Sequence, residues 1–89
     1  MDAVADFEEA WSRIRMNKGE VFRTVRGLDF TYKLLGPWVV IDRTDYRITK
    51  KNFLLAYGML PVEGPAGFGD EVTAKHYVHA VLTDPRITG

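Results

Sequence analysis

The segment Glu20-Val-Phe-Arg-Thr-Val-Arg-Gly-Leu-Asp-Phe-Thr-Tyr-Lys-Leu-Leu-Gly-Pro-Trp-Val-Val-Ile-Asp-Arg43 decides the fold of this chain. It contains three runs rich in β-branched and aromatic residues, which Gly27-Leu28 and Gly36-Pro37 separate. Such runs favour strands, and short glycine-containing turns between them favour antiparallel hairpins. We therefore expect a meander with strands at 20–26, 29–35 and 38–43, followed by a short fourth strand at 46–48.

The turn at Gly36-Pro37 sets the register of the second hairpin, because a two-residue turn fixes which side chains face each other. The expected pairs are Leu34 with Val39 and Tyr32 with Ile41 on one face, and Leu35 with Trp38 and Lys33 with Val40 on the other. The second face would be polar if it only met solvent. Leu35, Trp38 and Val40 therefore predict a cover, which is a later helix, a second subunit or a ligand.

The first hairpin permits two registers. A two-residue turn at Gly27-Leu28 places Val25 opposite Phe30, whereas a three-residue loop ending at Gly27 places Phe22 opposite Phe30. The partner of Phe30 differs by three positions between the two registers, and a slip by an odd number of residues exchanges the side chains that face the core. The sequence leaves this choice open.

Helices are expected before and after the meander in the sequence. In residues 2–17, Val4, Phe7, Trp11 and Ile14 fall on one face of a helix, which we expect to pack on the sheet with Trp11 as a core anchor. Thr49 is a suitable N-cap for a helix at 50–57.

The rest of the chain reads as a loop and a last helix. Residues 61–70 contain two prolines and three glycines, which predicts that 58–71 is a loop, either a flexible connector or a lid with Phe68 at its tip. Residues 73–83 fit a third helix, although apolar residues also alternate there as in a strand. The fold class is therefore α+β, with an N-terminal helix on a three- to four-stranded antiparallel meander and two short C-terminal helices.

Composition restricts the function classes. The chain has 89 residues, which corresponds to one domain, and no cysteine, so disulfides and thiolate chemistry are excluded. We find no segment that predicts a membrane span or a signal peptide, and we expect a cytoplasmic protein. His76 and His79 lack a third nitrogen or sulfur ligand for a metal. The one serine, Ser12, has no base near it in the sequence, and the glycines at 64–69 precede acids instead of the Lys-Ser/Thr of a phosphate loop. We expect no enzyme, no cofactor, no metal and no small-molecule substrate.

Charge is distributed unevenly along the chain. The net charge is zero, but residues 13–51 hold ten Lys and Arg against four acids. Five polar residues form a basic corner around the fourth strand and the next helix, namely Arg43, Arg47, Lys50, Lys51 and Asn52. Lysines in the first turn of a helix oppose the helix dipole, but they suit a contact with phosphates. We therefore expect nucleic-acid binding, to DNA first, at this corner. The alternative is a protein interface or a homodimer through Leu35, Trp38 and Val40.

Overall fold

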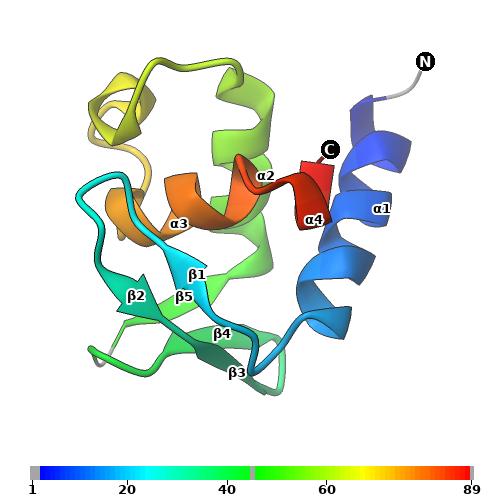
Figure 1. Ribbon diagram of the computed structural model, residues 1–89. Coiled ribbons are helices and arrows are strands. Elements are labelled where there is room, and N and C mark those ends of the chain that lie inside the picture. Colours follow the sequence, from blue (N-terminus) through cyan, green and yellow to red (C-terminus); the bar gives the residue numbers. More distant parts are fainter. Residues whose placement is uncertain (1–2, 45, 89) are drawn as a thin grey trace.

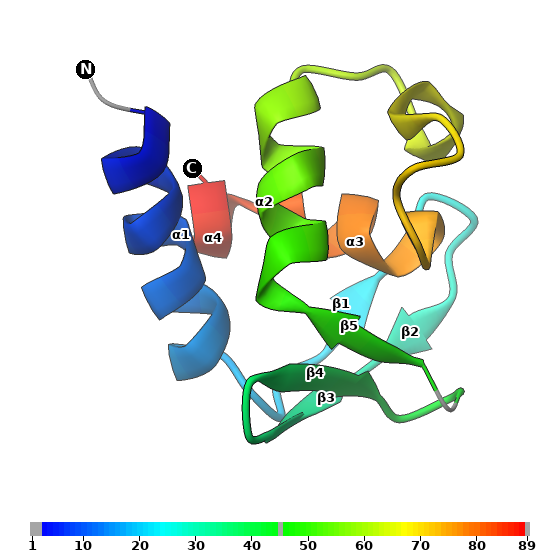
Figure 2. The ribbon, with the colours of Figure 1, turned by 180° about the vertical axis from the view of Figure 1, so that it is seen from behind.

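The computed structural model, which describes residues 3–44 and 46–88, has an α+β fold in which one helix precedes the strands and the other helices follow them. Two antiparallel sheets lie at one end, and the helices stand on one side of them (Figures 1 and 2). The elements are α1 (Ala3–Met16), β1 (Phe22–Arg23), β2 (Asp29–Phe30), β3 (Tyr32–Leu35), β4 (Trp38–Ile41), β5 (Arg47–Thr49), α2 (Lys50–Met59), the 3-10 helix η1 (Pro65–Phe68), α3 (Lys75–Leu82) and α4 (Pro85–Thr88). The expected fold class is confirmed. The expected start of the first helix at residue 2 and the Val4 side chain lie outside what is described.

The expected meander is divided into two sheets at Thr31. Strands β3, β4 and β5 form one sheet, whereas β1 and β2 form a separate hairpin. The Thr31 N–H donates to the Asp42 carboxylate at 2.9 Å, instead of to a backbone carbonyl. This side-chain bond ends the regular ladder, so the predicted strand at 29–35 becomes two shorter strands.

The structure has one definite register in each of the two hairpins. The pairs of β3 with β4 are those predicted from Gly36-Pro37. In the first hairpin, Phe22 lies opposite Phe30, which is the register of the three-residue loop. Gly27 has a φ of +85° in that loop, a conformation that glycine adopts without strain. The Thr24 hydroxyl accepts a hydrogen bond from the Leu28 N–H at 3.1 Å and closes the turn.

The core lies between the inner sheet face and the helices. Tyr32, Val39, Ile41 and Ile48 are buried on that face. Helix α1 packs along α2 and α4, and Trp11 contacts the Phe53 ring at a centroid distance of 5.8 Å. Trp11 is 9% exposed, so its predicted role as a core anchor is confirmed. Helices α1, α2 and α3 cover the sheet together, since their apolar residues belong to the same buried cluster.

The C-terminal half is more structured than the sequence suggested. Helix α3 confirms the helical prediction for 73–83, and Thr49 caps α2 by accepting from the Asn52 N–H at 3.1 Å. Within the predicted loop 58–71, Pro65 and Phe68 are buried in η1. The idea of a lid with Phe68 at its tip is therefore wrong, because that ring is needed to fill the core.

Helix α4 was not predicted, and it ties the two ends of the chain together. The Arg13 guanidinium donates to the Ile87 carbonyl at 3.1 Å. The Arg86 guanidinium lies 3.9 Å from the centre of the Phe22 ring and donates to the Val21 carbonyl at 2.8 Å. These contacts attach α4 to α1 and to the β1 hairpin.

Candidate functional site

The described helices leave the outer face of the β3-β4-β5 sheet open. By strand alternation and register it carries Lys33, Leu35, Trp38, Val40, Arg47 and Thr49. Leu35 is 48% exposed and Trp38 is 36% exposed. The described helices stand on the opposite side of this sheet (Figure 2). Of the three covers that the sequence suggested, a later helix is thus absent from the described residues, and a second subunit or a ligand remains. We call these six residues the outer sheet face.

An aromatic side chain and a cation are paired on this face. The Arg47 guanidinium lies 5.2 Å from the centre of the Trp38 ring. Trp38 lies opposite Thr49, and Val40 lies opposite Arg47. Trp38 and Arg47 are therefore diagonal neighbours on the same face of the two strands. Lys33 extends the row of Val40 and Arg47 on the far strand. In the described part of the chain, no carboxylate lies within 4 Å of the Lys33 or Arg47 nitrogens.

The residues of the basic corner point in different directions. Lys50 turns to α1, where its Nζ lies 2.6 Å from the Glu8 carboxylate and 5.8 Å from the centre of the Trp11 ring. Arg43 donates to the Asp29 carbonyl at 3.3 Å in the turn between β4 and β5. Of the five, Arg47 is the one that the strand register places on the outer sheet face.

Asn52 and Lys51 occupy the first turn of α2 and line a hollow with Thr49, which is the last residue of β5. The Asn52 amide donates to the Thr73 carbonyl at 3.0 Å and accepts from the Thr73 N–H at 2.9 Å. Both polar atoms of the amide are thus used to hold the segment before α3. Lys51 is exposed and lines a shallow hollow with Leu54 and Leu55.

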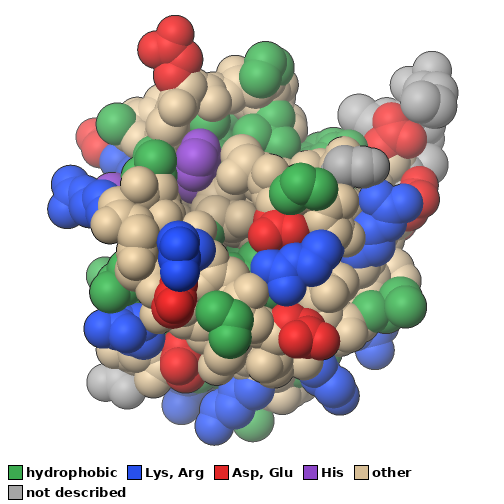
Figure 3. All heavy atoms as spheres, viewed as in Figure 1, with side chains coloured by type: hydrophobic (Ala, Val, Ile, Leu, Met, Phe, Trp, Pro, Cys, Tyr) green, Lys and Arg blue, Asp and Glu red, His purple; other side chains and the backbone are tan. Residues whose placement is uncertain are grey.

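Two further bases, Arg15 and Lys18, lie beside the β3–β4 hairpin near the end of α1. Arg15 of α1 and Lys18, which follows the helix, line a hollow together with Leu34 of β3. Arg15 also lines a hollow with Gly36 and Pro37 of the β3–β4 turn. Lys and Arg side chains gather along the lower edge of the molecule, below the sheet (Figure 3). Their sequence signal was their position around the end of this helix, since Arg15 lies in the last turn of α1 and Lys18 lies between α1 and β1.

The two histidines have separate environments. His76 is exposed, whereas His79 is half-buried and its ring centre lies 6.1 Å from that of Phe68. Burial, and secondly the charge of His76, lowers the pKa of His79. Its buried Nδ1 has no hydrogen-bond partner among the described residues. In the same residues no three His, Cys, Asp or Glu side chains gather as a metal ion would require.

Comparisons of this chain with models of protein families, with curated proteins and with solved structures give no significant match. None of the helices in residues 3–44 and 46–88 combines the length and the apolar character that crossing a bilayer requires. The function must therefore be argued from the geometry of the surface itself.

Proposed function

We propose that this protein is a non-enzymatic binding module whose outer sheet face binds single-stranded nucleic acid, with DNA as the first case. The observation that carries the proposal is the exposed Trp38 ring on an open sheet, with Arg47 beside it. Single strands bind proteins by stacking bases on aromatic side chains while nearby cations follow the phosphates. A base stacked on Trp38 would have Lys33 and Arg47 within reach of its phosphates.

The zero net charge of the chain is compatible with this role because the charges are separated in space. Asp6 stands near the start of α1 and Arg15 near its end, about 14 Å apart at the rise of an α-helix. Exposed charges are largely screened beyond about 10 Å at 0.1 M salt. A ligand at the sheet therefore meets the local bases more strongly than the distant acids.

The expected energies are modest. Stacking one base contributes about 1–3 kcal/mol, which corresponds to about 5- to 150-fold in affinity. Each phosphate contact on a single strand gives a slope of about −0.7 in log affinity against log salt. Two contacts, from Lys33 and Arg47, then predict a loss of about sevenfold between 50 and 200 mM salt.

The test is fluorescence anisotropy with labelled single-stranded oligothymidine, oligouridine and a DNA duplex at two salt concentrations. Trp38→Ala should weaken binding of the single strands about fivefold or more, whereas Leu54→Ala, an exposed apolar residue of α2, should not. Arg47→Gln should make the salt slope about 0.7 smaller, and Lys51→Gln is the matched control.

Each result separates one hypothesis from another. If Lys51→Gln weakens binding as much as Arg47→Gln, the basic corner at α2 is the binding surface instead of the sheet. Tighter binding of the duplex than of the single strands would reject base stacking on Trp38. The proposal fails if no oligonucleotide binds at low salt, or if Trp38→Ala binds normally.

A second function, self-association or protein binding, is favoured by the direct pairing of Leu35 with Trp38 on the exposed face. Adjacent apolar side chains left open to solvent are typical of interfaces. Sedimentation should then give about twice the 10.1 kDa mass of the chain, and Leu35→Lys should restore the monomer. A monomeric wild-type protein at high concentration would rule out the homodimer.

A further inference from the structure

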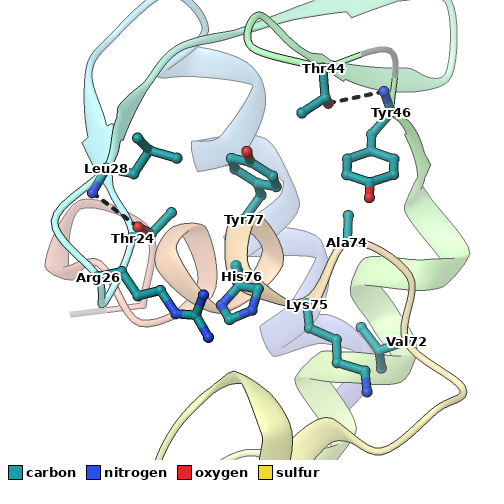
Figure 4. Close-up of a pocket in the computed structure, with 10 residues that line it drawn as sticks. All are labelled: Thr24, Arg26, Leu28, Thr44, Tyr46, Val72, Ala74, Lys75, His76 and Tyr77. Atoms are coloured by element: carbon teal, nitrogen blue, oxygen red, sulfur yellow. Dashed lines mark hydrogen bonds between the residues drawn. The ribbon is translucent and has the colours of Figure 1, made fainter.

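A hollow of about 440 Å³ opens between the β1–β2 loop, the β4–β5 turn and the start of α3. Its volume is within the range of small-molecule sites. Figure 4 shows that side chains from all three segments point into this space or along its border. The hollow is distinct from the outer sheet face, since none of the residues of that face lines it.

The floor of the hollow is apolar and aromatic. Tyr46 and Tyr77 lie side by side with ring centroids 6.1 Å apart, and Leu28 and Val72 complete the lining. Tyr46 is 46% exposed and Leu28 is 39% exposed. Apolar surface of this kind, left open to water within a concave site, favours a ligand with a flat apolar body.

The border of the hollow carries nitrogen groups. Figure 4 shows the Arg26 guanidinium beside the His76 ring, and the Lys75 side chain extends along the same border toward Val72. Lys75 has one acidic neighbour, Asp70, at 3.5 Å. The Asp70 side chain is fully exposed, so this ion pair is weak. Among the described residues that line the hollow there is no carboxylate.

The backbone at the wall of the hollow is strained. Ala74 has a φ of +56°, in the left-handed region that residues with a Cβ rarely adopt. Strained backbone persists only where the surrounding structure enforces it, and it is frequent at functional sites. This observation supports a site at the position that the cavity and its charges already indicate.

We propose that this hollow binds a small organic anion, with a flat apolar body on Tyr46 and Tyr77 and a carboxylate or phosphate group at Arg26, Lys75 and His76. The planar guanidinium of Arg26 can donate two parallel hydrogen bonds to either acid. The inference does not depend on the nucleic-acid proposal, because the two sites use different residues.

The test uses the ¹⁵N-labelled protein, titrated with 1-naphthoate, 1-naphthyl phosphate, inorganic phosphate and the neutral 1-naphthalenemethanol. For ligands of this size we expect a Kd of about 1 mM or tighter for the two naphthyl anions. The amide signals of Leu28, Tyr46, His76 and Tyr77 should shift. The neutral compound and inorganic phosphate should each bind at least about tenfold more weakly, because each lacks one half of the recognised chemistry. The ratio of the two anion affinities identifies the preferred acid.

Two variants and one control complete the experiment. Arg26→Gln should weaken the naphthyl anions about tenfold, and Tyr46→Ser should weaken them with the fold unchanged by circular dichroism. Arg15→Gln removes an exposed arginine far from the hollow and should bind like wild type. The proposal is overturned if neither anion shifts these signals, if Arg26→Gln binds as tightly as wild type, or if the shifts lie on the outer sheet face. Trp38→Ala should leave anion binding intact even if it abolishes nucleic-acid binding.

Discussion

Replacing Tyr32 by Phe should weaken the junction between the sheet and the first helix. Tyr32 is 1% exposed, and its hydroxyl donates a buried hydrogen bond of 2.6 Å to the Ile14 carbonyl. Ile14 lies in the last turn of α1, where carbonyls have no partner within the helix. The variant leaves that carbonyl unsatisfied, which costs about 1–3 kcal/mol. Each kcal/mol lowers the Tm of a domain of this size by about 4–8 °C.

The same substitution should change the response to alkaline pH. Burial raises the pKa of Tyr32 above its ordinary value, with Arg86 acting in the opposite direction and Asp84 in the same direction. The folded state therefore keeps the proton at pH values where the unfolded chain has released it. The stabilisation is complete below the unfolded pKa of about 10, and it is lost by up to about 1.4 kcal/mol per pH unit as the pH rises above that value. The variant lacks this decline.

The measurement is urea unfolding followed by tryptophan fluorescence between pH 7 and 11. Tyr57→Phe is the matched control, because Tyr57 is half-buried and its hydroxyl makes no hydrogen bond to the described residues. Its free energy of unfolding should change by less than about 0.5 kcal/mol. If Tyr32→Phe equals wild type at pH 7 and declines in parallel with it above pH 10, the buried hydrogen bond has no energetic role and the reasoning is refuted.

Three further predictions concern stability. Ala74→Gly should raise the free energy of unfolding by about 0.5 kcal/mol, since the relief of a left-handed φ exceeds the entropy cost of glycine. As a control, Ala10→Gly in α1 should lower the free energy of unfolding by about 1 kcal/mol or more. A lower free energy of unfolding for Ala74→Gly would contradict backbone strain at Ala74. Asn52→Ala should cost about 1–2 kcal/mol through its two bonds to Thr73, as chemical unfolding would show, and an unchanged value would mean that those bonds add nothing. The lowered pKa of His79 means that its stabilisation is present above the unfolded pKa of about 6.5 and is lost as the pH falls through the folded pKa. His79→Gln should therefore lose less stability than wild type between pH 7.5 and 5, and an identical loss would reject this assignment.

Local signals were sufficient for the second hairpin and insufficient for the first. Gly36-Pro37 allowed one register, and the structure has it. Around Gly27 the sequence allowed two registers, and the choice depends on distant contacts. Phe22 stacks on Phe30 at a centroid distance of 6.1 Å, and Arg86 covers the Phe22 ring. The residue that stabilises this register is thus more than sixty positions away, where a local pattern contains no information about it.

Helix α4 had a sequence signal that was interpreted in the opposite sense. Pro85 agrees with an end of the helix expected at 73–83, but proline also suits the first position of a helix, and aspartate suits the cap before it. The Asp84 carboxylate accepts from the Arg86 N–H at 2.8 Å. A short helix forms after such a cap only if its apolar side chain can be buried. In α4 this side chain is Ile87, which is buried. That site exists only once α1 and the hairpin are in place.

The candidate site also depends on tertiary structure, because residues that are neighbours in sequence need not lie on the same surface. Arg47 and Lys50 are three residues apart, but one ends on the outer sheet face and the other is bound to Glu8. The difference arises at the junction of β5 and α2, where side chains change from alternating between two faces to turning around a helix axis. A run of bases therefore predicts attraction to an anion without predicting where it binds. For this chain we expect Arg47 to contribute more to nucleic-acid binding than Lys50, because a ligand that used Lys50 would first have to displace Glu8.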